Sequence, residues 1–433
     1  MSKISATTPN TFETYGKSSV RELETYILYV DLNSCFASVE QQARPKLRNH
    51  PVAITNRLVE HSTIIAASVE AKAQGVKVGM RIEEAETICP GIIAAETEPD
   101  KYIYVHKLLK NILSDYSSNI VMKSIDEGLI DLHDSPAEVI DKPIAELANE
   151  IKTRIREEIG SYMRCNIGFG KNRFYGKLAA ELHKPDGADV IIEENSREVM
   201  KNLQLTNLPG INKRMEHRLN SFQIFTPLEL LDAESDTLEK LVFRSIVGKQ
   251  WYEKLRGKEV DDYSDATKTV GRQFVIPPET DEKTIEIYLA HLCEDVGARL
   301  RSHKLFARGL QIARVNDHGF LDNESPKSRQ KITQLYEVPF NSDIEIIDHA
   351  LKLYEKLPKT GRILMVTLYK LQPGPANQLS VFEDDLKHQQ KIAELTDNIN
   401  NRFGPRTIHS ALTTGSEEVR CKIPFGSTKY FGK

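Results

Sequence analysis

The sequence predicts a multidomain α+β protein, and three observations lead to this fold class. The chain has 433 residues, more than one compact core usually holds. From residue 26 to about 184, strand and helix patterns follow the order of a β-α-β-β-α-β ferredoxin-like core, interrupted by an insertion over residues 39–100. A second series of strand, helix, strand, strand, helix and strand runs through residues 272–370. We therefore expect two to four domains.

Apolar runs and turn residues place the elements of the first region. Ser68 caps a short helix that Gly75 closes. Further along, the apolar pattern of residues 119–133 is interrupted at Asp126-Glu127-Gly128, which predicts two strands joined by a tight turn. The predicted strands are 26–32, 51–55, 63–67, the two halves of 119–133 and 163–170, and the predicted helices are 68–75, 101–117, 136–160 and 171–184.

The remaining segments have less regular patterns. Residues 1–25 are polar and rich in Ser and Thr, without an apolar signal core, so we expect a disordered leader on a cytoplasmic protein. Residues 201–262 show short helices and turns, and residues 263–271 read as a polar linker. Residues 373–433 begin with a Pro/Gly-rich segment, which a helix at about 386–402 and a polar tail follow.

The composition is ordinary for a globular protein in water, with 28% charged and 40% hydrophobic residues. No apolar run reaches the ~18 residues that a membrane helix needs. The five cysteines are scattered and form no CxxC pair, which argues against a disulfide framework or a zinc site. The net charge of −4 argues only weakly against nucleic acid, because the distribution of charge matters more than its sum.

One stretch, RLRSHKLFARGLQIAR at residues 299–314, is strongly basic and contains no acid. Its cations alternate with apolar residues in a pattern of helix followed by strand. This suits a cationic surface that contacts phosphates, although a charge run of this kind also fits a solvated face. The cations are Arg299, Arg301, Lys304, Arg308 and Arg314.

Three carboxylates stand where strands of the predicted core end. Asp31 follows the apolar run that begins at Tyr26, and Asp126 and Glu127 lie at the break between the next two strands. Neighbouring strand residues face opposite sides, so Asp126 and Glu127 share a ligand only if the backbone turns, which Gly128 would permit. The first strand and this hairpin are central neighbours in a ferredoxin-like core. The sequence therefore predicts that the three carboxylates converge.

Converging carboxylates raise one another's pKa unless a cation neutralises them. Oxygen ligands without His or Cys beside them suit Mg²⁺ or Mn²⁺ rather than Zn²⁺. Carboxylates on adjacent strands form two-metal sites for phosphoryl or nucleotidyl transfer, in which one ion activates the attacking oxygen and the other holds the leaving group. Each acid alone also fits a capped loop or an exposed turn, so the metal site depends on their combination.

Basic residues near the last core strand are candidates for holding a phosphate at such a site. The segment NIGFGKNRFYGKLA carries Lys171, Arg173 and Lys177, Lys184 follows it, and Lys72 lies in the insertion. The spacing is not that of a Walker A loop, and Arg173 stands where a dinucleotide fingerprint has its third glycine. Lys177 and Lys72 are the candidates that could reach a phosphate at the strand ends, although on spacing alone both fit solvated lysines better.

At these residues the sequence resembles the Y-family DNA polymerases, over about residues 26–415. DLNSCFASVE and SIDEGLIDL are similar to the two metal motifs, SVEAKAQGVKVGM to the fingers motif, NIGFGKNRFYGKLAAELHKPDG to the last palm motif and LPGI to the thumb turn. The resemblance implies a right-hand polymerase that performs error-prone translesion synthesis in the DNA damage response, without proofreading. Its parts would be a palm at 26–38 and 101–200, fingers at 39–100, a helix-hairpin-helix thumb at 201–262 and a little finger at 272–372.

The resemblance assigns roles to the site residues. Asp31 and Asp126 would bind two Mg²⁺ ions, or Mn²⁺, with help from the Leu32 carbonyl. Glu127 would complete the site near the primer 3′-OH. Lys177 and Lys72 would hold the triphosphate.

Phe36 lies where the family has its sugar gate, an aromatic ring that packs beneath the deoxyribose and leaves no room for a 2′-hydroxyl. Cys35, a small residue before it, would keep the approach of the nucleotide open. Without the surrounding motifs, Phe36 would read as an ordinary core aromatic.

The fingers motif indicates a branch of the family. Val69 and Lys72 replace the Tyr and Arg that the family often has, and Lys lacks the bidentate fork of Arg. Both residues resemble the bacterial UmuC-like branch, the catalytic subunit of polymerase V, with some polymerase IV-like features. That branch implies a UmuD-like accessory dimer and a recombinase filament as partners.

Other partners would bind outside the palm. QLSVF at residues 378–382 resembles the peptide that docks bacterial polymerases on the sliding clamp, with Gln378, Leu379 and Phe382 as anchors, although it also fits a linker. Primer-template DNA would be bound through phosphate contacts, and its binding would be strongly salt-dependent. These contacts would come from Gly210, Ile211 and Lys213 in the thumb and from Arg299, Arg301, Lys304 and Arg308 in the little finger.

Two alternatives to the polymerase remain open. One is a catalytically weak scaffold, derived from a polymerase, that binds DNA and the clamp. Such a chain would be expected to have lost the acids, and Asp31, Asp126 and Glu127 are present. The other is a different two-metal nucleotidyl enzyme with the same palm, such as a cyclase, which would need neither the thumb turn nor the clamp-like peptide.

Overall fold

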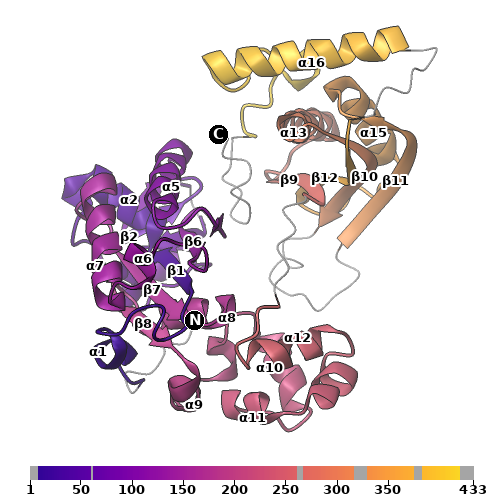
Figure 1. Cartoon of the computed structure of the whole chain (residues 1–433). Helices are drawn as coiled ribbons and strands as arrows, with labels where there is room; N and C mark the ends of the chain where they lie inside the picture. Colours follow the sequence, from indigo (N-terminus) through magenta and orange to yellow (C-terminus); the bar gives the residue numbers. More distant parts are fainter. Residues whose placement is uncertain (1–7, 60–61, 261–266, 316–328, 375–382, 420–433) are drawn as a thin grey trace. The chain divides into compact units, whose positions relative to one another are not determined.

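The computed structural model describes residues 8–59, 62–260, 267–315, 329–374 and 383–419 (Figure 1). They form two compact units: the first unit contains the described residues up to 260, and the second unit those from 267 to 419. Within these ranges, no helix is long and apolar enough to cross a membrane.

A five-stranded sheet forms the centre of the first unit, in the order β5-β6-β1-β7-β8. β1 lies in the middle, antiparallel to both β6 and β7, and five of its six residues are buried. The ferredoxin-like core that the sequence predicts is confirmed. The strands are β1 (Ile27–Leu32), β5 (Ile120–Met122), β6 (Glu127–Asp131), β7 (Cys165–Gly170) and β8 (Ala188–Ile191).

The side chains of β1 alternate between the two faces of this sheet. Leu28, Val30 and Leu32 belong to the main core, together with residues of α2, α5 and α7. Tyr29 packs on the opposite face, where α8 covers the sheet, so Asp31 belongs to the α8 face. The helices are α2 (Cys35–Ala43), α5 (Pro99–Ser114), α7 (Ile144–Arg154) and α8 (Arg173–Leu182).

The insertion between β1 and α5 has a three-stranded sheet of its own, in the order β3-β2-β4. Ser68 caps its first helix as predicted, because the hydroxyl accepts a hydrogen bond from the Ala71 N–H at 3.2 Å. The elements are β2 (Val52–Thr55), β3 (Ile64–Ala67), α3 (Val69–Ala73), α4 (Ile82–Ile88) and β4 (Ile93–Glu96).

The prediction of a turn at Gly128 was wrong. The backbone bends ahead of Glu127, where β6 begins. Gly128 therefore lies inside β6, where it pairs with Val30 of β1. A Cβ at Gly128 would come within 2.5 Å of Leu113 Cδ1. The glycine is therefore required for close packing of α5 on the sheet, not for a turn.

The prediction of a disordered leader was wrong for the described part of it. Helix α1 (Thr11–Tyr15) packs on β8, and the Thr11 hydroxyl donates to Asp189 Oδ1 at 3.0 Å. Thr8, Thr11 and Val20 are all buried. These buried contacts with the central sheet are long-range and leave no local pattern in the sequence.

The last part of the first unit is helical and has its own core around Trp251. Its helices are α9 (Glu193–Lys201), α10 (Lys213–Asn220), α11 (Pro227–Asp232) and α12 (Val247–Lys254), with a further helical turn at Thr237–Val242.

The second unit is an antiparallel sheet in the order β11-β10-β12-β9, with α13 and α15 packed on one face. The order of its elements along the chain is the predicted one, except that the expected linker 263–271 overlaps the start of β9. The elements are β9 (Thr269–Val275), α13 (Glu282–Ser302), β10 (Leu305–Val315), β11 (Arg329–Phe340), α15 (Asp343–Glu355) and β12 (Ile363–Pro373).

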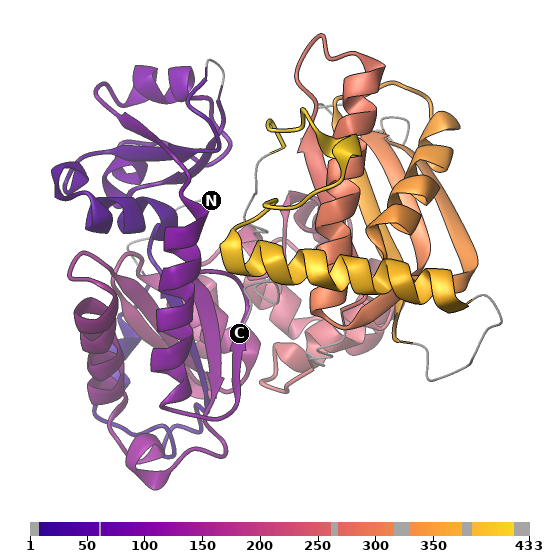
Figure 2. The same cartoon turned by 90° about the horizontal axis from the view of Figure 1, so that it is seen from above.

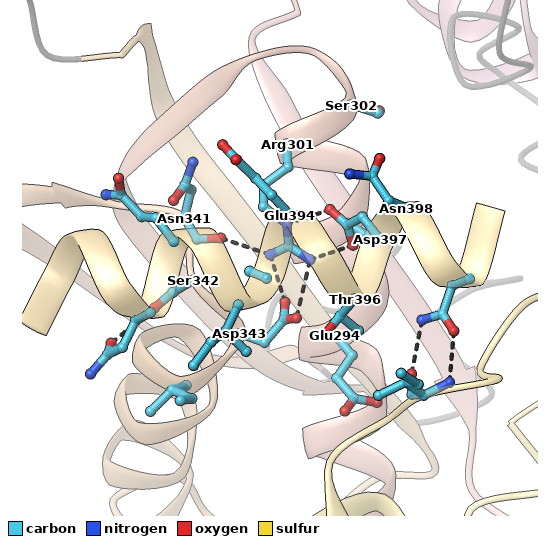
Figure 3. A pocket seen from close by; sticks show the side chains of 18 of the residues that line it. Glu294, Arg301, Ser302, Asn341, Ser342, Asp343, Glu394, Thr396, Asp397 and Asn398 are labelled. Carbon is cyan, nitrogen blue, oxygen red and sulfur yellow. Dashed lines mark hydrogen bonds and ion pairs between the residues drawn. The ribbon is translucent and has the colours of Figure 1, made fainter. Parts of the chain in front are cut away.

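Helix α16 (Glu383–Phe403) lies across α13 and α15 in both views of the molecule (Figures 1 and 2). A cavity of about 1010 Å³ is lined by residues of α13, α15 and α16, and Arg301 is one of them (Figure 3). The Arg301 guanidinium binds Asp343 Oδ1 at 2.8 Å and Asp397 Oδ2 at 2.6 Å, and its side chain is only 6% exposed. Arg301 therefore holds α16 to the unit and is not available for DNA, contrary to the prediction.

We expect Arg301→Met to release α16, because Asp343 and Asp397 would lose a buried counter-charge worth about 3 kcal/mol. Hydrogen exchange of the amides in 388–403 should accelerate by about a hundredfold. Arg308→Met, which removes an exposed arginine from the same unit, is the matched control and should change exchange little. Equal exchange in the two variants would show that the ion pairs do not hold the helix.

Candidate active site

The structure brings the three predicted carboxylates to one end of the central sheet. Asp31, the fifth residue of β1, pairs in register with Glu127, the first residue of β6. Asp126 precedes Glu127. Its carbonyl accepts a hydrogen bond from the Leu32 N–H at 2.9 Å, which holds this bend of the backbone against β1. The Ser124 hydroxyl donates to the Asp126 carboxylate.

Two of these carboxylates, Asp31 and Asp126, are costly to ionise. Burial raises the pKa of Asp31 to about 7, and the charges of Glu181 and Asp126 add to the effect, against the opposing charge of Lys184. Burial, with the charge of Glu127, also raises the pKa of Asp126. A cluster of this kind accepts a cation readily, since a positive charge would remove the penalty.

Lysines supply that positive charge in the structure. Lys184 Nζ lies 3.0 Å from Asp31 Oδ2 and 2.9 Å from Glu181 Oε1. Lys177 Nζ lies 2.9 Å from Glu127 Oε2. The carboxylates thus have two cationic sides, Lys184 beside Asp31 and Lys177 beside Glu127.

Lys72 belongs to the Asp31 side. Its ammonium donates to Ser34 Oγ at 2.9 Å, in the turn that follows β1. Burial lowers the pKa of Lys72, and the nearby charge of Lys184 lowers it further. Lys72 is therefore near enough to Lys184 to feel its charge, and it contacts the turn after β1, whereas Lys177 binds Glu127.

Lys184 is the site residue that the sequence reasoning noted but did not select. Two buried amides position its loop: Asn166 Nδ2 donates to the His183 carbonyl at 3.1 Å, and Asn33 Oδ1 accepts the Asp186 N–H at 2.7 Å. Asn33 and Asn166 are also hydrogen-bonded to each other at 3.0 Å. These contacts join distant parts of the chain, and spacing alone does not reveal them.

Helix α8, which carries Lys177 and Glu181, lies very close to the sheet. A Cβ at Gly168 of β7 would be only 2.1 Å from the Gly176 carbonyl oxygen. The glycines of the NIGFG segment therefore let the helix reach the strand ends. Beside Glu127, a cavity of about 260 Å³ is lined by Tyr29, Lys123, Glu127, Arg173, Phe174, Lys177, Pro209 and Lys254.

The donor set fits a hard divalent cation, because the oxygen ligands that the side chains offer here are carboxylates. Within the described residues, no group of three or more His, Cys, Asp or Glu side chains is already arranged to hold a metal ion. The lysine contacts explain this, since Lys184 and Lys177 occupy carboxylate oxygens. A metal would have to displace them.

Phe36 and Cys35 begin helix α2 and are both buried. Phe36 stacks on Tyr102, with ring centroids 4.3 Å apart and an interplanar angle of 11°. Cys35 is 4% exposed and belongs to the main core, and its role in keeping the approach of the nucleotide open stays a prediction.

The predicted DNA contacts fall into different environments. Ile211 is buried and its N–H donates to the Leu208 carbonyl at 3.0 Å, so this N–H is used within the turn. Gly210, in the same turn, has a φ of +98°, which favours glycine. Exposed positions are Lys213, Lys304 and Arg308, whereas Arg299 is partly buried and donates to the Gly271 carbonyl at 3.3 Å. Gln378, Leu379 and Phe382 lie outside the described residues.

Comparison with known proteins identifies relatives along nearly the whole chain. Residues 30–181 match the impB/mucB/samB family and residues 267–381 its C-terminal domain. DNA polymerase IV of Moorella thermoacetica is 31% identical over 400 residues, which are 89% of this chain and 96% of that protein. DNA polymerase IV 1 of Bacillus subtilis is 27% identical over 94% of this chain and 96% of that protein.

The solved structure of a Y-family DNA polymerase chimera, Dbh-Dpo4(243-245)-Dbh, has the same fold. It matches 80% of this chain and 99% of its own with a TM-score of 0.67, at 22% identity. The relatives are called DNA polymerase IV, so the prediction of the UmuC-like branch was wrong, and Val69 and Lys72 do not decide the branch. From these matches, the chain belongs to the impB/mucB/samB family of Y-family DNA polymerases.

Proposed function

We propose that this polymerase copies damaged templates by two-metal nucleotidyl transfer at the Asp31, Asp126 and Glu127 site. The observation that carries the proposal is the convergence of three carboxylates at the ends of β1 and β6, two of which bind lysines. Two Mg²⁺ ions there would lower the pKa of the primer 3′-OH and neutralise the leaving pyrophosphate. Asp31, Asp126 and the Leu32 carbonyl would hold them, and Glu127 would stand on the primer side.

The lysines divide the site into a nucleotide side and a primer side. We assign Lys184, which binds Asp31, and Lys72, which donates to Ser34 in the turn after β1, to the triphosphate. Its negative charge would replace that of Asp31 as the partner of Lys184. Lys177 lies next to Glu127 and lines the 260 Å³ cavity. This revises the role of triphosphate ligand that the resemblance implies for Lys177.

The cavity beside Glu127 suits the phosphates at the end of the primer strand. Four cationic side chains line it against one carboxylate, and Pro209 of the predicted thumb turn forms part of its wall. Phosphate contacts of this kind fix the register of a duplex without reading its sequence. Exposed Lys213, Lys304 and Arg308 would add contacts further along the duplex.

Phe36 remains the proposed sugar gate, at the point where the chain turns from β1 into α2. The sliding clamp remains a proposed partner, through residues 378–382, and the bacterial cytoplasm the proposed place of action. The UmuD-like dimer and the recombinase filament followed from the branch assignment that the relatives overturn, and they are not proposed.

Primer extension on a defined template with Mg²⁺ tests the proposal. Asp126→Ala should reduce the rate of extension by about a thousandfold, because the metals would lose a ligand that acts on the developing charge. Its affinity for primer-template should not fall. Asp134→Ala, which removes an exposed acid from the turn after β6, is the control and should extend normally. Normal extension by Asp126→Ala would refute the metal assignment.

Metal binding can also be measured without turnover. A ligand that binds only the folded state stabilises it, by about 2.7 kcal/mol at a hundredfold excess over Kd. Saturating MgCl₂ should therefore raise the Tm of the wild type, while Asp126→Asn and Asp31→Asn should show a much smaller rise. The same Mg²⁺-dependent rise in all three proteins would place the ion elsewhere.

A further inference from the structure

A sugar gate works only if its ring keeps its position when a 2′-hydroxyl presses against it. Phe36 is 5% exposed and is the second residue of α2, whose N-cap, Ser34, has a φ of +50°. One face of its ring is covered by the ring of Tyr102, which lies nearly parallel at 4.3 Å. Such offset-stacked aromatic pairs contribute more than the area they bury.

Tyr102 is itself fixed by Glu40. The Tyr102 hydroxyl donates to Glu40 Oε1 at 3.0 Å, and both side chains are fully buried. Tyr102 thus has two anchors, its ring against Phe36 and its hydroxyl against a carboxylate. A ring anchored at its far end cannot swing away from the gate without breaking a buried hydrogen bond.

Glu40 lies one helical turn after Phe36, so both point from the same side of α2. Its second oxygen accepts a hydrogen bond from Lys101 Nζ at 3.1 Å, and Arg44 Nη2 lies 3.7 Å from it. A fully buried carboxylate needs such partners, since burying it without them would be very unfavourable. One oxygen of Glu40 therefore holds Tyr102, and the other is neutralised by cations.

The same residues join the two ends of the insertion that carries β2, β3 and β4. Glu40 and Arg44 stand where the chain leaves α2 for this insertion, and Lys101 and Tyr102 stand where it returns into α5. Glu98 at the return binds both Arg44 and Lys101. The support of the gate and the attachment of the insertion thus share one buried carboxylate.

We propose that Tyr102 and Glu40 are positioning residues for sugar selection: Glu40 fixes Tyr102, and Tyr102 backs the Phe36 ring so that it cannot tilt to admit a ribonucleotide. The inference rests on the proposed role of Phe36 and extends it. Neither residue touches the reacting atoms. Their loss should therefore affect the choice between sugars more than the rate with deoxynucleotides.

The test is the ratio of kcat/KM for dCTP over CTP, measured with the full chain on an undamaged primer-template. Tyr102→Leu and Glu40→Leu, which remove the backing ring and its anchor, should lower this ratio by about tenfold. Tyr102→Phe keeps the ring and Glu40→Gln keeps an acceptor, so both should lower it by less than about threefold. Phe36→Ala, measured in parallel, should lose most of the selectivity.

Tyr116→Phe is the matched control. Tyr116 is also buried, and its hydroxyl also donates to a glutamate, Glu150 Oε1 at 3.0 Å, but it lies past the end of α5, about fourteen residues after Tyr102. This variant should keep the wild-type ratio. It shows how much of any change comes from a lost Tyr–Glu hydrogen bond as such.

A Tyr102→Leu enzyme that uses dCTP and CTP less well by the same factor would overturn the inference, because a merely structural role predicts that result. The inference would then be wrong while the gate stood, provided that Phe36→Ala had lost selectivity. Unchanged selectivity in Phe36→Ala would overturn the gate and the inference together. If Glu40→Leu shows no cooperative melting, the two Tyr102 variants decide the question.

Discussion

The burial of carboxylates at the end of a central strand is the constraint on which the site depends. β1 is covered on both faces, so Asp31 at its end is removed from most of the water that would stabilise its charge. Lys184 offsets this, and it can do so only because Asn33 and Asn166 hold its loop against the strand. The carboxylates of the site are thus neutralised by lysines. A divalent cation would take over the carboxylates, and a triphosphate would take over lysines, so both would be expected to bind together. Asp31 is fixed for that exchange by its place on the central strand of the sheet.

The two sides of the site follow from the alternation of strand residues. Tyr29, Asp31 and Glu127 share the face that α8 covers, and α8 delivers both Lys177 and Glu181 to it. The other face of β1 carries only apolar residues into the main core. Phe36 and Tyr102 belong to that core. The ring of the proposed gate is therefore held by the same packing that stabilises the core. Selection of the sugar would then depend on ordinary packing.

The sequence was sufficient to predict what local pattern determines. The strand and helix order, the convergence of Asp31, Asp126 and Glu127 and the N-cap at Ser68 all rest on periodicity, spacing or capping chemistry. What it missed rests on contacts between distant residues. The docking of Thr11 on Asp189, the capture of Arg301 by Asp343 and Asp397, and the position of Lys184 each join segments far apart in the chain. A cation in a basic run looks the same in the sequence whether it is solvated, as Arg308 is, or buried, as Arg301 is.

The division of the site into a nucleotide side and a primer side is the central claim, and transient kinetics of two lysine variants test it most directly. The account predicts that Lys184→Ala weakens the apparent affinity for the incoming dNTP while leaving the Kd for primer-template unchanged. Lys177→Ala should do the reverse, weakening primer-template binding or the placement of the primer end at constant dNTP affinity. If both variants weakened dNTP affinity alone, the two lysines would serve one triphosphate, and the division drawn from their contacts with Asp31 and Glu127 would be contradicted.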